Sequence, residues 1–146
     1  MPSRFKTLVA LVFVLCSCGG ASTPEAVVTA WLEAASNGDA NAFRAAFPSR
    51  DEVADLFVCP AGLSLVDRFD APNPDFAAWR NGRPTLTGTT RVAAEPVATG
   101  MPVGGCNARR NLDLLRMDAT LHLAGAERTL RLRLVAFDGQ HRILGY

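Results

Sequence analysis

The stretch LRMDATLHLAGAERTLRLRLVAF, residues 115–137, decides the fold. Apolar and polar residues alternate from Leu115 to Leu123, and a second alternation runs from Thr129 to Leu134. A period of two places the apolar side chains on one face of a strand. The segment Ala124–Glu127 between them is typical of a hairpin turn, and Asp138-Gly139 predicts a second turn into a last strand. The C-terminal third is therefore predicted to be an antiparallel meander.

The middle of the chain gives weaker signals. Residues 85–97 are rich in Thr and Val and predict a strand, and Pro96 near its end indicates a sheet edge. Residues 99–107 contain three glycines and a proline, which predicts a loop. Residues 61–69 fit either a helix or a strand. Residues 75–79 predict a single helical turn.

Three helix starts mark the N-terminal third of the domain. Thr23 is a good N-cap, and Asn37-Gly38 ends this first helix. Asp39 caps a short second helix, and Ser49–Glu52 forms a capping box that opens a third helix running to Cys59. Helices followed by an antiparallel meander predict an α+β fold with the helices covering one face of the sheet. The first helix carries apolar residues at helical spacing: Val27, Val28, Trp31, Leu32 and Ala35.

The first residues of the chain follow the pattern of an export signal. Arg4 and Lys6 precede an unbroken apolar run, Leu8–Leu15, which is too short to span a bilayer. The following residues resemble the bacterial lipobox, with an aliphatic residue at −3 and a small one at −1 before the lipidated cysteine: Leu15-Cys16-Ser17-Cys18. Cys16 departs from the family pattern, because a small residue is usual at −2.

This resemblance implies cleavage before Cys18 and attachment of acyl chains such as palmitate to that residue. We expect a lipoprotein signal peptide at 1–17, a lipidated tether at 18–22 and one domain at 23–146. The expected location is the cell envelope, at the periplasmic face of the outer membrane if the source is Gram-negative. The alternative is a plain secretory signal that is cut after Ala21 and carries no lipid.

Two cysteines remain after Cys16 leaves with the signal peptide and Cys18 takes lipid. Export predicts an oxidising compartment, so we expect Cys59 and Cys106 to form a disulfide, which contributes roughly 4 kcal/mol in the chain-entropy model. A zinc site is disfavoured because the sequence has no CxxC spacing. A thiol nucleophile is disfavoured because no positioned base is evident.

The first helices carry a family resemblance. The opening of nuclear-transport-factor-2-like domains is similar to four stretches of this chain: TPEAVV at 23–28, Trp31-Leu32, Asn37–Asp39 and Phe43. The resemblance implies a cone-like fold, with helices on a curved antiparallel sheet and a pocket between them. This family includes polyketide cyclases, ketosteroid isomerase and many small bacterial lipoproteins, so it does not imply an enzyme.

A few side chains are candidates for a site. Trp31 and Trp79 are pocket candidates, with packing in the core or at its rim as the alternative. His122 and Asp118 lie four residues apart on one predicted strand, so Asp118 could orient His122 as a general base if their face lined the cone. The alternative is a solvated outer face, because the opposite face of the strand is apolar. His141 is expected in a loop or at the rim.

The near-neutral net charge of the chain argues against one class of function, nucleic-acid binding. Without Arg4 and Lys6, 13 basic residues remain against 14 acidic ones, so no general attraction to nucleic acid is expected. No pattern predicts a metal or a cofactor. The sequence predicts a membrane-anchored envelope lipoprotein whose domain binds a small apolar ligand or an envelope protein without catalysing a reaction. Two alternatives stay open: a cyclase- or isomerase-type enzyme using His122 and Asp118, and a structural lipoprotein that docks through an Arg-rich sheet face.

Overall fold

The computed structural model describes residues 22–61 and 74–146, so Cys18 and most of the ambiguous stretch 61–69 lie outside it. The described helices are α1 (Pro24–Asn37), α2 (Ala40–Ala45), α3 (Arg50–Leu56) and α5 (Pro74–Gly82). The described strands are β1 (Phe57–Val58), β2 (Thr85–Val97), β3 (Pro102–Val103), β4 (Cys106–Ala108), β5 (Leu112–Leu123), β6 (Ala126–Phe137) and β7 (Gln140–Gly145). The predicted α+β class is confirmed. Within the described ranges, no helix combines the length and the apolar character needed to cross a membrane.

The predicted helix starts are confirmed by their capping contacts. The Thr23 hydroxyl accepts a hydrogen bond from the Ala26 N–H at 3.2 Å, and Gly38 closes α1 in the left-handed conformation with φ 72°. Before α3, Ser49 Oγ accepts from the Glu52 N–H at 3.1 Å, and Glu52 Oε2 accepts from the Ser49 N–H at 2.8 Å. This reciprocal pair is a capping box, which satisfies backbone donors that the helix leaves unpaired.

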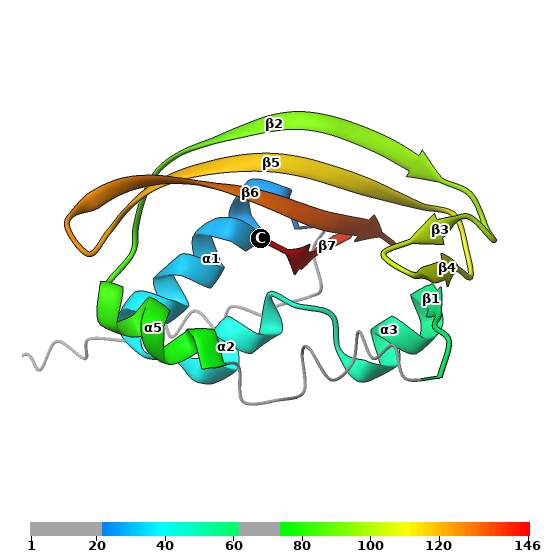
Figure 1. The fold of residues 1–146 in the computed structure, drawn as a ribbon, viewed down its shortest axis with the longest axis horizontal. Helices are drawn as coiled ribbons and strands as arrows, with labels where there is room; N and C mark the ends of the chain where they lie inside the picture. Colours follow the sequence, from blue (N-terminus) through cyan, green and yellow to red (C-terminus); the bar gives the residue numbers. More distant parts are fainter. Residues whose placement is uncertain (1–21, 62–73) are drawn as a thin grey trace, which may run out of the picture.

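The main sheet has four antiparallel strands in the order β2-β5-β6-β7 and arches over α1 (Figure 1). Its central strands alternate as predicted over Met117–Leu121 and Arg131–Leu134, where the inward residues are buried and those between them are partly or fully exposed. The two hairpin turns lie at Ala124-Gly125 and Asp138-Gly139, and all four residues have positive φ. The buried residues on this face include Met117, Ala119, Leu121, Leu132 and Leu134.

A second, smaller sheet corrects two predictions. Residues 99–107 were expected to form a loop, but Pro102 and Val103 pair with Asn107 and Cys106 around Gly104-Gly105. Both glycines have positive φ, 57° and 90°, so this dipeptide makes a two-residue hairpin turn. The third helix was expected to reach Cys59, but it ends at Leu56 because the backbone is already extended at Phe57, which begins β1.

The predicted disulfide between Cys59 and Cys106 is present, with an S–S distance of 2.04 Å. Cys59 follows β1 directly and Cys106 begins β4, so the bond ties the end of the helical region to the small sheet, where β1 and β4 are also paired. The two cysteines are 47 residues apart in the chain. A covalent closure of that length restricts the unfolded chain and is expected to stabilise the fold by roughly 4 kcal/mol.

Candidate functional site

Both tryptophans lie in an aromatic cluster between the helices and the sheet. Trp31 is fully buried, and its ring centroid lies 5.2 Å from that of Trp79 and 5.2 Å from that of Tyr146. Phe43 and Phe47 pack on other sides of Trp31 at 5.7 and 6.1 Å. These separations are those of packed aromatic pairs. The structure therefore places both pocket candidates in the core, in the region where the family resemblance puts a pocket.

The indole nitrogens of this cluster differ in their bonding. Trp79 Nε1 donates a hydrogen bond to the Tyr146 hydroxyl at 3.3 Å. Trp31 Nε1 is buried and has no hydrogen-bond partner among the residues that the structure describes. An unpaired buried donor costs free energy, so packing of the Trp31 ring has to offset that cost. The cluster stabilises the junction of α1, α5 and the Gly145–Tyr146 end of the sheet.

His122 and Asp118 lie on the face of β5 that points away from α1. His122 is exposed and Asp118 is half-buried, whereas the residues between and beside them on the other face are buried. Across the strand pair, Asp118 is opposite Arg131 and His122 is opposite Glu127. The pair therefore shares a face as predicted, and that face is the outer one.

His141 is the second residue of β7 and contacts the residue that precedes the α1 cap. Its backbone N–H donates to Ser22 Oγ at 3.1 Å, and its Nδ1 lies 2.5 Å from the Ser22 carbonyl oxygen. A carbonyl oxygen only accepts, so Nδ1 carries the proton in this contact. The Ser22 N–H in turn donates to the Gly139 carbonyl at 3.0 Å. His141 thus fastens the start of the domain to the β6–β7 turn.

Three arginines form ion pairs that brace the helices and the sheet. Arg91 on β2 holds the Glu25 carboxylate of α1 with its Nε 2.5 Å from Oε1, and these hydrogen bonds are the main reason that the pKa of Glu25 is lowered from 4.5 to about 2. Arg142 on β7 contacts Glu52 of α3 at 3.0 Å. Arg110 bridges Asp55 of α3 and Asp138 of the β6–β7 turn, and both carboxylates raise its pKa.

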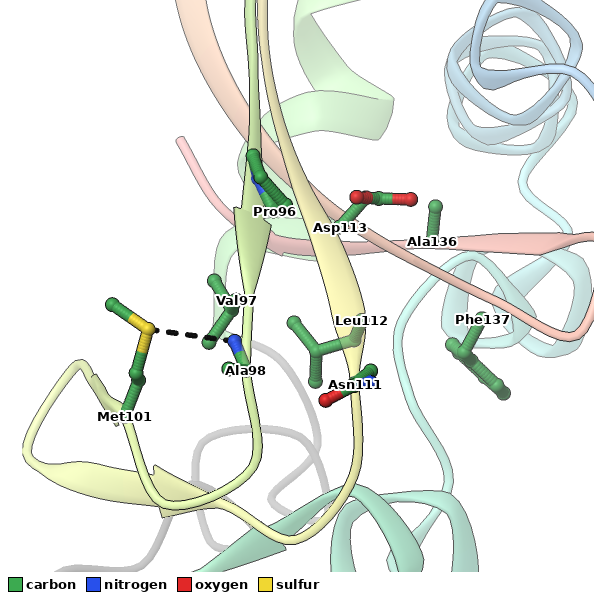
Figure 2. A pocket seen from close by; sticks show the side chains of 9 residues that line it. All are labelled: Pro96, Val97, Ala98, Met101, Asn111, Leu112, Asp113, Ala136 and Phe137. Carbon is green, nitrogen blue, oxygen red and sulfur yellow. Dashed lines mark hydrogen bonds between the residues drawn. The ribbon is translucent and has the colours of Figure 1, made fainter.

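An open hollow of about 470 Å³ lies where β2, β5 and β6 end near the small sheet (Figure 2). Met101 stands at one side of the hollow and Phe137 at the other, with Leu112 and Asn111 between them. A volume of this size lies in the range of small-molecule sites. The other residues of the lining are Pro96, Val97, Ala98, Asp113 and Ala136.

The polar groups of this end hollow are few. Asn111 Oδ1 accepts a hydrogen bond from the Thr99 N–H at 3.1 Å, which fixes the side-chain orientation. Met101 Sδ accepts from the Ala98 N–H at 3.4 Å. Asp113 is exposed, and among the described residues its carboxylate takes part in no salt bridge. Apolar walls with one carboxylate and one amide suit an apolar ligand that carries a hydrogen-bond donor.

A second hollow, of about 420 Å³, lies on the outer face of the main sheet. Its charged residues are Arg116, Asp118, Arg131 and Arg133, and Val92, Met117 and Leu132 complete the lining. Arg131 and Arg133 also border a hollow of about 230 Å³ beside Leu144–Tyr146. The arginine-bearing face predicted from the alternation is thus present, and it is concave in two places.

Sequence reasoning did not find the end hollow. Met101 was assigned to a loop, and neither Asn111 nor Phe137 belongs to a recognisable motif. The only available signal was Gly104-Gly105, which turns the chain back and brings Met101 next to Ala108 at the end of β4. In the described part of the chain, no three His, Cys, Asp or Glu side chains gather closely enough to hold a metal ion.

Comparison of the chain with protein-family models, with curated proteins and with solved structures found no match. The resemblances to the lipobox and to nuclear-transport-factor-2-like domains therefore stay predictions from the residues that carry them.

Proposed function

We propose that this chain is a membrane-anchored envelope lipoprotein whose domain binds a small apolar ligand without catalysing a reaction. The anchor is Cys18, supported by the apolar run and the lipobox-like residues before it. Two or three acyl chains hold a protein at a membrane durably, whereas one chain holds it only marginally. The disulfide between Cys59 and Cys106 fits an oxidising compartment such as the envelope.

The neighbouring cysteines provide a matched test of the anchor. Cells that express the full chain are fed an alkyne-bearing palmitate analogue, and the label is read in the gel. Cys18→Ala is expected to abolish labelling, because the acceptor sulfur is lost. Cys16→Ala serves as the control and is expected to keep the label. Label that persists in Cys18→Ala, or that disappears only in Cys16→Ala, would contradict the assignment.

The single observation that carries ligand binding is the end hollow. Its walls combine an aliphatic floor, Leu112, with a flexible thioether, Met101, and an aromatic ring, Phe137. Methionine adapts to irregular apolar shapes, which suits a site for a flexible ligand. Asp113 and Asn111 offer an acceptor and an amide at the same hollow, so the proposed ligand is apolar with a hydroxyl or amine group.

Native mass spectrometry of the exported chain tests this proposal directly. A retained apolar adduct is expected in the wild-type spectrum. Met101→Glu is expected to remove the adduct, because it places a charge in an apolar wall while the parent side chain is 44 % exposed and its loss spares the core. Val92→Glu is the control, since Val92 is 56 % exposed and lies outside the end hollow. If both variants retained the adduct, the end hollow would not be the ligand site.

A second candidate function is docking of an envelope protein on the outer sheet face. The hollow with three arginines and one aspartate favours it, because guanidinium groups bind carboxylates with two parallel hydrogen bonds. Arg116→Ala with Arg133→Ala is expected to release a partner that is crosslinked in intact cells to the wild-type chain. A crosslink of unchanged mass and yield in this double variant would rule out docking at these arginines. The double variant is expected to keep the ligand adduct in its native mass spectrum.

A further inference from the structure

Strand β6 is paired on one edge along nearly its whole length and on the other edge along only part of it. β5 pairs with β6 from Ala126 to Ala136, whereas β7 pairs only with Arg133–Phe137. Beyond Gly145, the Tyr146 ring packs against Trp31 and Trp79, away from the edge. No described strand pairs with the remaining stretch of β6, Ala126–Leu132, which we call the open edge.

An unpaired strand edge presents backbone N–H and C=O groups that accept another strand. Proteins usually block such edges with prolines, bulges or inward charges. The open edge contains neither proline nor glycine, and its register with β5 runs without a shift from Asp113 opposite Ala136 to Leu123 opposite Ala126. One charged side chain of this stretch, Arg128, lies on the inner face opposite Leu121 of β5, but it is exposed. The open edge is otherwise a regular strand, seven residues long, that is suited to pairing.

We propose that two copies of this chain pair antiparallel through their open edges, around a two-fold axis at Thr129. Such an axis is perpendicular to the sheet and keeps each face on its own side. Thr129 is the central residue of Ala126–Leu132, so an axis at this position uses the whole open edge. The pairing places Ala126 opposite the partner's Leu132 and supplies roughly one backbone hydrogen bond per residue pair.

The charges of the open edge support this register. The axis at Thr129 places Glu127 of each copy opposite the partner's Arg131, which gives two identical ion pairs. Both side chains are exposed and lie on the outer face, since they stand opposite His122 and Asp118 of β5. Among the described residues neither of them takes part in a salt bridge. An axis at Arg131 would instead bring arginine against arginine, which is unfavourable.

Among the remaining pairs, Arg128 stands opposite the partner's Leu130, against which its methylene stem can pack. Thr129 faces the partner's Thr129, and threonine pairs across strands are favourable. Past Ala126, the partner's Ala124-Gly125 turn meets the end of β7 at Gly145, where the hollow of about 230 Å³ offers room for a turn of small residues. The two main sheets would join into one continuous sheet. This pairing does not depend on the proposed ligand or its hollow.

A cysteine at the axis tests the pairing in the full chain in its own membrane. In Thr129→Cys the two Cα atoms at the axis lie about 5.5 Å apart, within the range that a disulfide spans, so an oxidised sample is expected to run as a covalent dimer that reductant separates. Thr90→Cys, at an exposed position of the opposite edge strand β2, is the control and is expected to stay monomeric. A covalent dimer of Thr90→Cys in the same yield as that of Thr129→Cys would overturn the proposal.

Charge exchange in the Thr129→Cys background then tests the register. Glu127→Arg alone and Arg131→Glu alone are each expected to reduce crosslinking roughly tenfold, because two attractions become two repulsions. The double exchange is expected to restore it, since the pairs re-form with reversed signs. A product with the mass of a different protein, a monomer in all variants, or crosslinking that neither exchange changes would each overturn the proposal. The palmitate label of the Cys18→Ala variant tests the membrane anchor by a separate readout, so a failure of the anchor and a failure of the pairing can be told apart.

Discussion

The two edges of the main sheet are built differently. The β2 edge is irregular, because its register with β5 shifts between Leu86 and Gly88 and again between Arg91 and Ala93, and it ends near Pro96. Arg91 also fastens β2 to α1 through Glu25. The other side of the sheet consists of β7 and the open edge of β6. The β6–β7 register shifts between Arg133 and Leu134, whereas the open edge has no shift against β5 and no proline. Irregular edges resist strand addition and regular ones permit it, so the sheet directs association to a single edge.

The largest expected effect tests how far the stability of the β2 side depends on the disulfide between Cys59 and Cys106. β2 runs toward the small sheet (Figure 1), where the disulfide joins Cys106 of β4 to Cys59, the residue after β1. Cys59→Ser combined with Cys106→Ser is expected to lower the free energy of unfolding by about 4 kcal/mol. Urea denaturation of the exported chain measures the change. Wild-type protein in reductant should show the same loss, and a loss below about 1 kcal/mol would contradict the assigned role.

A somewhat smaller effect is expected beneath the open edge. Leu132 is 1 % exposed and faces the helices, so Leu132→Ala removes core contacts and is expected to cost about 3 kcal/mol of unfolding free energy. Leu86→Ala on β2 is the matched control, because Leu86 is only half-buried, and should cost about 1 kcal/mol. Equal costs in urea denaturation would show that the open edge is no more firmly supported than the β2 edge.

The smallest expected effect concerns the ion pair that holds β2 to α1. The folded-state pKa of Glu25 is lowered from 4.5 to about 2, so its stabilisation is complete above pH 4.5 and is lost as the pH falls from 4.5 toward 2. Glu25→Gln is expected to remove that part of the pH dependence of the melting temperature. Solvent screens this exposed pair, so the difference should be small at pH 7. Melting curves that coincide with wild type across this pH range would contradict the lowered pKa.

The elements that the sequence predicted correctly depend on local patterns. Thr23, Gly38 and Ser49 act within one helical turn of themselves, and the alternation from Leu115 onward needs only neighbouring residues. The short β3–β4 hairpin was missed because strands of two and three residues are too short to show a period. Its Gly104-Gly105 turn resembles ordinary loop sequence until the flanking pairs are known.

The candidate sites were harder to predict than the fold. The end hollow collects residues from three separate segments of the chain, including Pro96, Leu112 and Phe137, and no spacing in the sequence records that they meet. The outer face of His122 was recognisable because the opposite face is apolar. Trp31 and Trp79 pack against each other between the helices and the sheet. Composition alone does not determine how such rings pack, so the sequence could not place them in the core.

The contacts of Ser22 have a mechanical consequence. Any pull transmitted along residues 1–21 reaches Ser22, where hydrogen bonds to Gly139 and His141 share the load between α1 and the β6–β7 hairpin. A single helix end would fray under tension, whereas a joint to two elements has to break several bonds together. Thr129 lies ten residues along β6 from that joint, roughly 33 Å at strand spacing. The contacts of Ser22 and the open edge are therefore far apart, so tension on Ser22 does not have to disturb pairing at the open edge.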